Sequence, residues 1–129
     1  MASQVTPDAG GYCPYVQHAM ELLGRRWTAS VIGVLLAETG LRFGEIRCRI
    51  PGLSDRLLAE RLAELEREGV VTRNDDAGHV TYRTTDKGRA LGGLIAEAGR
   101  WGHQWYDGSL GRRPGRIGGC RPDVEPPAC

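Results

Sequence analysis

Apolar residues recur every three or four positions through most of the first seventy residues of the chain. This spacing is typical of amphipathic helices that pack one face on a core. It predicts four helices, which cover residues 14–23, 26–38, 42–49 and 54–68. In the first helix we expect an inward face made of its apolar residues, which are Val16, Ala19, Met20 and Leu23.

The segment over residues 54–68 carries the clearest helix signals. Ser54 is a good N-cap, and the carboxylate of Asp55 lies in the first turn, where it interacts favourably with the helix dipole. Leucines then repeat at helical spacing, at positions 58, 62 and 65. Because Pro51 and Gly52 end the preceding helix, the two helices are predicted to form a helix-turn-helix.

Residues with high strand propensity follow this motif. Residues 70–73 and 79–84 flank an Asn/Asp/Gly-rich turn at 74–78, which predicts a β-hairpin. Thr85 can N-cap a last helix over residues 86–106. This order predicts a mainly α fold with a small β-hairpin, that is, a winged helix-turn-helix domain with a C-terminal dimerisation helix.

The two ends of the chain lack the apolar residues of the middle. Residues 1–11 are small and polar, and residues 108–129 are rich in Gly, Pro and Arg. Such segments bury too little apolar surface to offset the entropy of ordering them. We therefore expect a flexible N-terminal arm, one domain over residues 12–107 and a disordered tail. A length of 129 residues suits a single domain.

The overall charge gives no sign of a nucleic-acid partner. The chain has 17 Lys and Arg residues against 16 Asp and Glu residues, a formal net charge of +1. A DNA-binding surface must therefore be a local face of the fold. The longest apolar run, over residues 29–37, is far shorter than the ~20 residues of a membrane helix. With no secretory signal at the N-terminus, the sequence predicts a cytoplasmic protein.

No motif for catalysis or for a cofactor is present in the sequence. The chain lacks a GxSxG elbow, a Walker loop, a dinucleotide-binding glycine pattern and an HExxH zinc motif. Its four cysteines include no CxxC pair, and its three histidines have no zinc-ligand spacing relative to them. We expect no enzyme, no cofactor, no metal site and reduced thiols.

The predicted helix-turn-helix offers specific candidates for contact with duplex DNA. Its second helix normally enters the major groove with its N-terminal residues at base edges. Arg56 lies opposite the leucines and near the helix start, where it can reach a guanine edge or a phosphate. Ser54 can bind a phosphate at the helix N-terminus, next to Asp55. Glu60, on the same outward face, can accept from a cytosine amino group or repel the DNA backbone.

Further candidates for contact with DNA flank this helix. Those at the preceding helix are Arg42, Arg47 and Arg49, and those beside the hairpin turn are Arg73, His79 and Arg83. The first group lies where a helix crosses the DNA backbone, and the second can straddle a minor groove. Asp75 and Asp76 oppose deep entry of the hairpin. The alternative is that the arginines form surface ion pairs, as the spacing of Arg61 and Glu64 suggests.

The last predicted helix carries more apolar surface than one thin domain can cover. Its stripe consists of Leu91, Leu94, Ile95, Ala98, Trp101 and Trp105. Two tryptophans four positions apart can anchor an interface, so this stripe predicts a homodimer. The alternative is that the tryptophans close the core of the monomer against the first helix.

Six blocks of the sequence resemble the HxlR-type bacterial transcriptional regulators, in the order that this family has them. They read CP, LLGRRW, LRFGEI, IPGLSDRLL, LAELEREG and YRTTDKG, and they begin at residues 13, 22, 41, 50, 62 and 82. The resemblance implies a homodimeric winged-helix protein of the broad MarR-like kind that binds a near-palindromic operator. It places Ser54, Asp55 and Arg56 at the start of the recognition helix. The family usually has Gln-Lys or a similar pair in place of Asp55-Arg56, so the operator sequence does not carry over.

Cys13 opens the first predicted helix, beside Pro14. Helix N-termini stabilise thiolates, which are the species that oxidants and electrophiles modify. The resemblance adds that some HxlR-type regulators sense oxidants, quinones or aldehydes through the cysteine at this position. Two interpretations stay open for Cys13, a redox sensor and a small buried hydrophobe.

Together these features predict a sequence-specific DNA-binding regulator that acts as a repressor and responds to oxidants or electrophiles through Cys13. The alternative is a winged-helix module that binds another protein and has no specific DNA binding.

Overall fold

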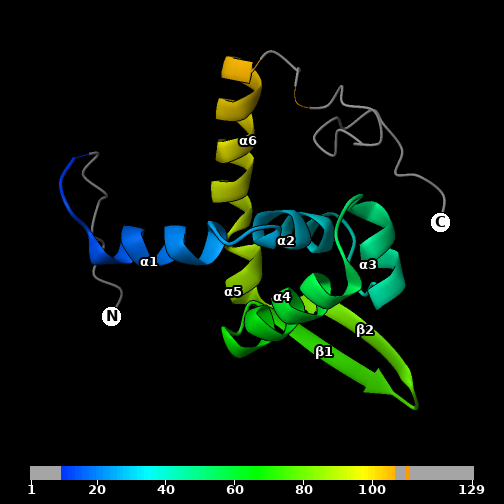
Figure 1. The fold of residues 1–129 in the computed structure, drawn as a ribbon. Coiled ribbons are helices and arrows are strands. Elements are labelled where there is room, and N and C mark those ends of the chain that lie inside the picture. Colours follow the sequence, from blue (N-terminus) through cyan, green and yellow to red (C-terminus); the bar gives the residue numbers. More distant parts are fainter. Residues whose placement is uncertain (1–9, 107–109, 111–129) are drawn as a thin grey trace.

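The computed structural model describes residues 10–106 and residue 110, and it is mainly helical with one antiparallel hairpin (Figure 1). The elements in chain order are α1 (Pro14–Leu23), α2 (Thr28–Ala37), α3 (Phe43–Arg49), α4 (Asp55–Arg67), β1 (Val71–Asp76), β2 (His79–Thr84), α5 (Asp86–Arg89) and α6 (Gly92–Tyr106). The winged helix-turn-helix architecture is thus confirmed. The predicted N-terminal arm, except residues 10 and 11, and the predicted tail, except residue 110, lie outside the described residues.

The core forms around α2, which contacts α1, α3, α4, α5, α6 and β2. Val31, Ile32 and Leu35 of α2 are fully buried. The leucines of α4 at positions 58, 62 and 65 pack into the same cluster. Full burial of one such side chain contributes ~1.5–3 kcal/mol, so this apolar contact holds α4 against the body of the domain.

The hairpin is longer and its turn tighter than the sequence predicted. The strands pair from Val71 opposite Thr84 to Asp76 opposite His79, so only Ala77 and Gly78 form the turn. Both have positive φ, 51° and 88°, as a two-residue type I′ turn requires. The backbone N–H of Gly78 donates to Oδ1 of Asp75 at 3.0 Å. The predicted turn over residues 74–78 was therefore wrong, because alanine adopts the left-handed conformation there.

The single last helix predicted over residues 86–106 is divided in the structure. A turn at residues 90 and 91 separates α5 from α6, and the N–H of Leu91 donates to the carbonyl of Gly88 at 3.0 Å. Gly88 lies so close to Val70, the residue before β1, that an added Cβ would be 2.2 Å from the carbonyl oxygen of Val70. The short α5 is thus fixed against the hairpin, and a new helix begins at Gly92.

Helices α1 and α6 project from the body of the domain (Figure 1). The expectation that Val16 and Met20 face inward was wrong, because both are exposed and α1 has no buried residue. Leu91, in the turn before α6, and Ile95 on α6 pack against the core, whereas Leu94, Ala98, Trp101 and Trp105 of α6 are exposed. Exposed fractions of 58% for Trp101 and 65% for Trp105 contradict the alternative that they close the monomer core.

Candidate nucleic-acid interface

The helix-turn-helix consists of α3, the turn over residues 50–54 and α4. Ile46 of α3 and Leu58 of α4 are both fully buried, so both helices pack against the core. Ser54 is the N-cap of α4 as predicted, and its Oγ accepts from the backbone N–H of Leu57 at 3.2 Å. Gly52 adopts a φ of 89° in the turn, a conformation that favours glycine.

An ion pair joins α3 to the first turn of α4. Nη1 of Arg47 lies 3.1 Å from Oδ1 and 3.3 Å from Oδ2 of Asp55. Both side chains are more than half exposed, so the pair is screened by solvent and contributes little to stability. A phosphate could replace Asp55 as the partner of Arg47 at small cost.

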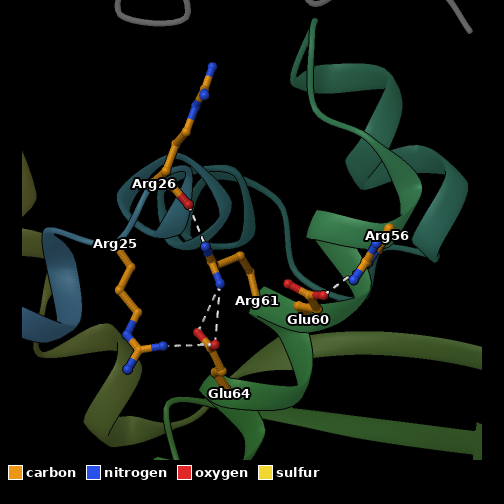
Figure 2. Close-up of polar contacts among 6 residues, drawn as sticks. All are labelled: Arg25, Arg26, Arg56, Glu60, Arg61 and Glu64. Carbon is orange, nitrogen blue, oxygen red and sulfur yellow. Dashed lines mark hydrogen bonds and ion pairs between the residues drawn. The ribbon is translucent and has the colours of Figure 1, made fainter.

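Arg56 has the position that the sequence predicted, outward and in the first turn of α4. Its side chain is 90% exposed. Its Nε donates to Oε1 of Glu60 one turn later, at 3.3 Å (Figure 2). Because this bond uses Nε, the exposed terminal nitrogens of the guanidinium can present their fork to a base edge or a phosphate.

Arg42 and Arg49 have different surroundings at the two ends of α3. Arg42 is the N-cap residue; its side chain is exposed, and its backbone N–H donates to Oε1 of Glu45 at 2.9 Å. Arg49 is only 21% exposed and binds both carboxylate oxygens of Glu38, through Nε at 3.0 Å and Nη2 at 2.9 Å. Its Nη1 also donates to the carbonyl of Glu45 at 2.9 Å. Arg49 thus joins the end of α3 to the end of α2.

The three candidate DNA-contact residues of the hairpin lie on two faces of it. Arg83 pairs with Thr72 and His79 with Asp76, whereas Arg73 pairs with Tyr82. Since side chains alternate along a strand, His79 and Arg83 share one face and Arg73 lies on the other. All three side chains are exposed. The guanidinium of Arg83 also lies next to Gly40, where an added Cβ would be 3.0 Å from Nη2.

Two groups of residues near the site were missed by the sequence analysis. Tyr12 and Tyr15 extend the exposed apolar surface of α1. Arg25 and Arg26, between α1 and α2, make polar contacts with Arg61 and Glu64 of α4. The Arg61–Glu64 ion pair that the helical spacing suggested is present at 3.2 Å, but it is partly buried, with the two side chains 13% and 21% exposed. The contacts to residues 25 and 26 span 39 and 35 positions in the chain, respectively, so no local pattern indicates them.

The polar face of α6 is occupied by its own ion pair. Glu97 and Arg100 are joined by hydrogen bonds, and the bond from Arg100 lowers the pKa of the Glu97 carboxyl below its ordinary value. On the apolar face, the rings of Trp101 and Tyr106 meet edge to face with centroids 5.8 Å apart. Because Glu97 and Arg100 pair with each other, their side chains do not cover the aromatic surface of α6.

Cys13 is the N-cap residue of α1, and its carbonyl accepts from the N–H of Gln17 at 3.0 Å. The thiol is free and the residue is partly exposed, so it is not a buried hydrophobe. Cys48 is disulfide-bonded, so the expectation of four reduced thiols does not hold for it. Across residues 10–106, no three His, Cys, Asp or Glu side chains are grouped so that they could hold a metal ion. Within the same residues, no helix has the length and apolar content to cross a membrane.

Comparison with known proteins places this geometry in a family. Residues 22–109 match the HxlR-like helix-turn-helix family. The HTH-type transcriptional regulator YvaP of Bacillus subtilis is 41% identical over 76% of this chain and 93% of its own length. The HTH-type transcriptional regulator YodB of the same organism is 40% identical over 74% of this chain and 87% of its own length.

Solved structures of redox-responsive regulators share the fold. Reduced YodB from B. subtilis has a TM-score of 0.66 at 39% identity, covering 74% of this chain and 95% of that chain. Quinone-bound YodB has a TM-score of 0.65 at 40% identity, covering 73% of this chain and 100% of that chain. The redox regulator HypR in its oxidised form has a TM-score of 0.65 at 28% identity, covering 71% of this chain and 96% of that chain. The sequence relatives are transcriptional regulators and not enzymes, and the chain belongs to the HxlR-like helix-turn-helix family of transcriptional regulators.

Proposed function

We propose that the protein represses transcription by binding a near-palindromic duplex operator as a homodimer, with α4 of each protomer in a major groove. The observation that carries this proposal is the two-sided character of α4. Its leucines are buried in the core, while Arg56 stands 90% exposed one position after the first residue of the helix. A helix held in this way offers its N-terminal half to base edges.

The surrounding residues supply contacts to the DNA backbone in this proposal. Ser54 and the start of α4 can donate to a phosphate, and Arg42 and Arg47 flank that point from α3. The hairpin adds Arg73, His79 and Arg83. Arg49 contributes least, because Glu38 and the Glu45 carbonyl already take up its guanidinium. Asp55 and Glu60 hold arginines in place until DNA replaces them.

A second copy of the chain is the proposed partner of α1 and α6. The exposed apolar side chains of these two helices, together with Tyr12 just before α1, are Tyr12, Tyr15, Val16, Met20, Leu94, Trp101, Trp105 and Tyr106. Apolar surface of this extent is typical of a protein–protein interface. A two-fold dimer presents two recognition helices, which is the symmetry that a near-palindromic operator requires.

Salt dependence tests whether the partner is DNA. If Arg42 and Arg47 of each protomer of a dimer lie on phosphates, these four contacts alone should make the affinity for duplex DNA fall with a log–log slope of about −3.6 against salt concentration, and the hairpin contacts should make it steeper. Fluorescence anisotropy with a labelled operator at several salt concentrations measures this slope. Binding to another protein through an apolar surface would be nearly independent of salt, and no measurable DNA binding at low salt would contradict the proposal.

For the effector, we propose that oxidants or electrophiles modify Cys13 and thereby lower the affinity for the operator. The Cys13 thiol is free, partly exposed and located at the end of α1, next to the exposed residues Tyr12 and Tyr15. The relative YodB has been solved in quinone-bound and diamide-treated forms. Modification at this point can move α1 relative to a partner subunit and so change the distance between the recognition helices.

Serine substitution at Cys13 should abolish the response to diamide or to a quinone while leaving operator binding by the untreated protein intact. The matched control keeps Cys13 and replaces Cys48, Cys120 and Cys129 with serine, and it should still respond. Gel-shift titrations of the treated and untreated proteins measure the change. Full oxidant-dependent release by Cys13→Ser would remove the sensor role from Cys13.

A further inference from the structure

We propose that residues 25–27, between α1 and α2, position the recognition helix α4, with Arg61 as the residue that ties α4 to this junction. Movement of α1 would then be passed to α4 through a rigid connection. The inference rests on the proposed DNA binding, because it assigns a role in placing α4 on the operator.

The junction is a tight and strained turn. The N–H of Thr28 donates to the carbonyl of Arg25 at 3.1 Å, which closes the turn, and the carbonyl of Trp27 accepts from Val31 at 2.9 Å as α2 begins. Trp27 adopts a φ of 74°, in the left-handed region that bulky residues rarely occupy. Such a conformation persists only where the surroundings fix it. The angle between α1 and α2 is therefore well determined.

The junction contacts the helix-turn-helix at three successive places. The Trp27 ring lies over the turn between α3 and α4, 3.7 Å from where a Cβ of Gly52 would be. Further along α4, Nε of Arg61 donates to the carbonyl oxygen of Arg26 at 2.8 Å. Less than a turn later, Glu64 accepts from Nη1 of Arg25 at 2.9 Å. Figure 2 shows the last two contacts side by side, with the Arg26 side chain pointing away and its carbonyl pointing to Arg61.

Arg61 is the centre of this connection. Its side chain is only 13% exposed, unlike Arg56 on the same helix. While Nε holds the Arg26 carbonyl, Nη1 donates to both carboxylate oxygens of Glu64, at 3.2 and 3.3 Å. Glu64 thus has two arginine partners and links the side chain of Arg25 to that of Arg61. The Arg61–Glu64 pair at its centre is 13% and 21% exposed and is stiffer than an exposed surface pair, whereas the Arg25 side chain that joins it is 57% exposed.

Little else joins α1 to α4. A cavity of about 280 Å³ lies between them, and it is lined by His18, Glu21, Leu22, Arg25, Glu64, Arg67 and Glu68. None of the residues of α1 is buried. Because α1 and α4 are not closely packed at this cavity, they are connected at one end of it by the polar contacts of residues 25 and 26 with α4.

Hydrogen exchange of the full-length reduced protein, with and without a saturating operator duplex, tests this inference. In the wild type, we expect DNA on α4 to slow the exchange of the backbone amides of residues 24–30 by about fivefold or more, as for a typical coupling between sites. In Arg61→Gln this protection should fall below about twofold. Arg67→Gln removes the same charge from the same helix, and because the Arg67 side chain makes no hydrogen bond or ion pair with the described residues, this control should keep the protection.

The outcomes separate the inference from the proposed function. If Arg61 were merely structural, Arg61→Gln would raise exchange without DNA but retain the DNA-induced difference, which overturns the inference. Unchanged exchange over residues 24–30 in a wild-type protein that binds the duplex also overturns the inference and leaves the proposed function standing. A protein that binds no duplex in the gel-shift control removes both. If Arg61→Gln does not fold, Glu64→Gln replaces it, because this variant keeps the size of the side chain. In Glu64→Gln too, the DNA-induced protection of residues 24–30 should fall below about twofold.

Discussion

Replacing Trp101 and Trp105 together with glutamate should give a folded monomer whose affinity for a two-site operator is lower by about 10²- to 10⁴-fold. The two side chains are exposed on α6, so the substitutions leave the core unchanged. In the proposed dimer, however, the two glutamates of each protomer would place four negative charges in the apolar interface. Without the dimer, the second recognition helix no longer binds at the high effective concentration that the first one provides.

Analytical ultracentrifugation gives the oligomeric state, and anisotropy titration with the same operator gives the affinity. The control is the double variant with phenylalanine at both positions, which keeps an apolar aromatic surface and should remain dimeric. Circular dichroism checks that the glutamate variant is folded. A glutamate variant that stays dimeric with unchanged affinity would place the interface elsewhere.

Alanine at position 56 should remove the base preference at one position of each half-site. A bidentate arginine–guanine contact contributes about 1–3 kcal/mol of discrimination, and the exposed guanidinium of Arg56 is placed to make it. Competition by duplexes with single base changes measures this preference. The effect should be confined to one symmetric pair of positions, because Arg56 is a single side chain near the start of α4.

Lysine at the same position is the matched control, since it keeps the charge but not the planar fork. Arg56→Lys should lose the base preference and retain the salt dependence of the wild type. If Arg56→Ala leaves the preference at every position unchanged, sequence is not recognised through Arg56.

Local signals predicted α4 well. An N-cap serine and a leucine repeat act within a few residues of one another, and the structure places Ser54 and Leu58 as they indicate. The order of helices, hairpin and helix was equally visible. The orientation of Arg56 follows from the same periodicity, since the residue opposite a buried leucine stripe must face solvent.

The errors have physical causes. An amphipathic helix has the same spacing of apolar residues whether that face packs on its own domain or binds a partner protein. The exposure of Val16 and Met20 was therefore not predictable from the sequence. The break before Gly92 depends on the approach of Gly88 to the Val70 carbonyl, a contact that only the folded chain makes. The links between residues 25–27 and α4 are likewise tertiary. They join segments that no local pattern relates.

Selection of bound duplexes from a random pool tests the central claim most directly. The full-length reduced protein should enrich two similar half-sites in inverted orientation, with centres 10–10.5 base pairs or about 34 Å apart, one turn of the DNA helix. That result would show that a symmetric pair of chains recognises sequence through one helix each. Enrichment of no motif, or of a single unrepeated one, would contradict the account.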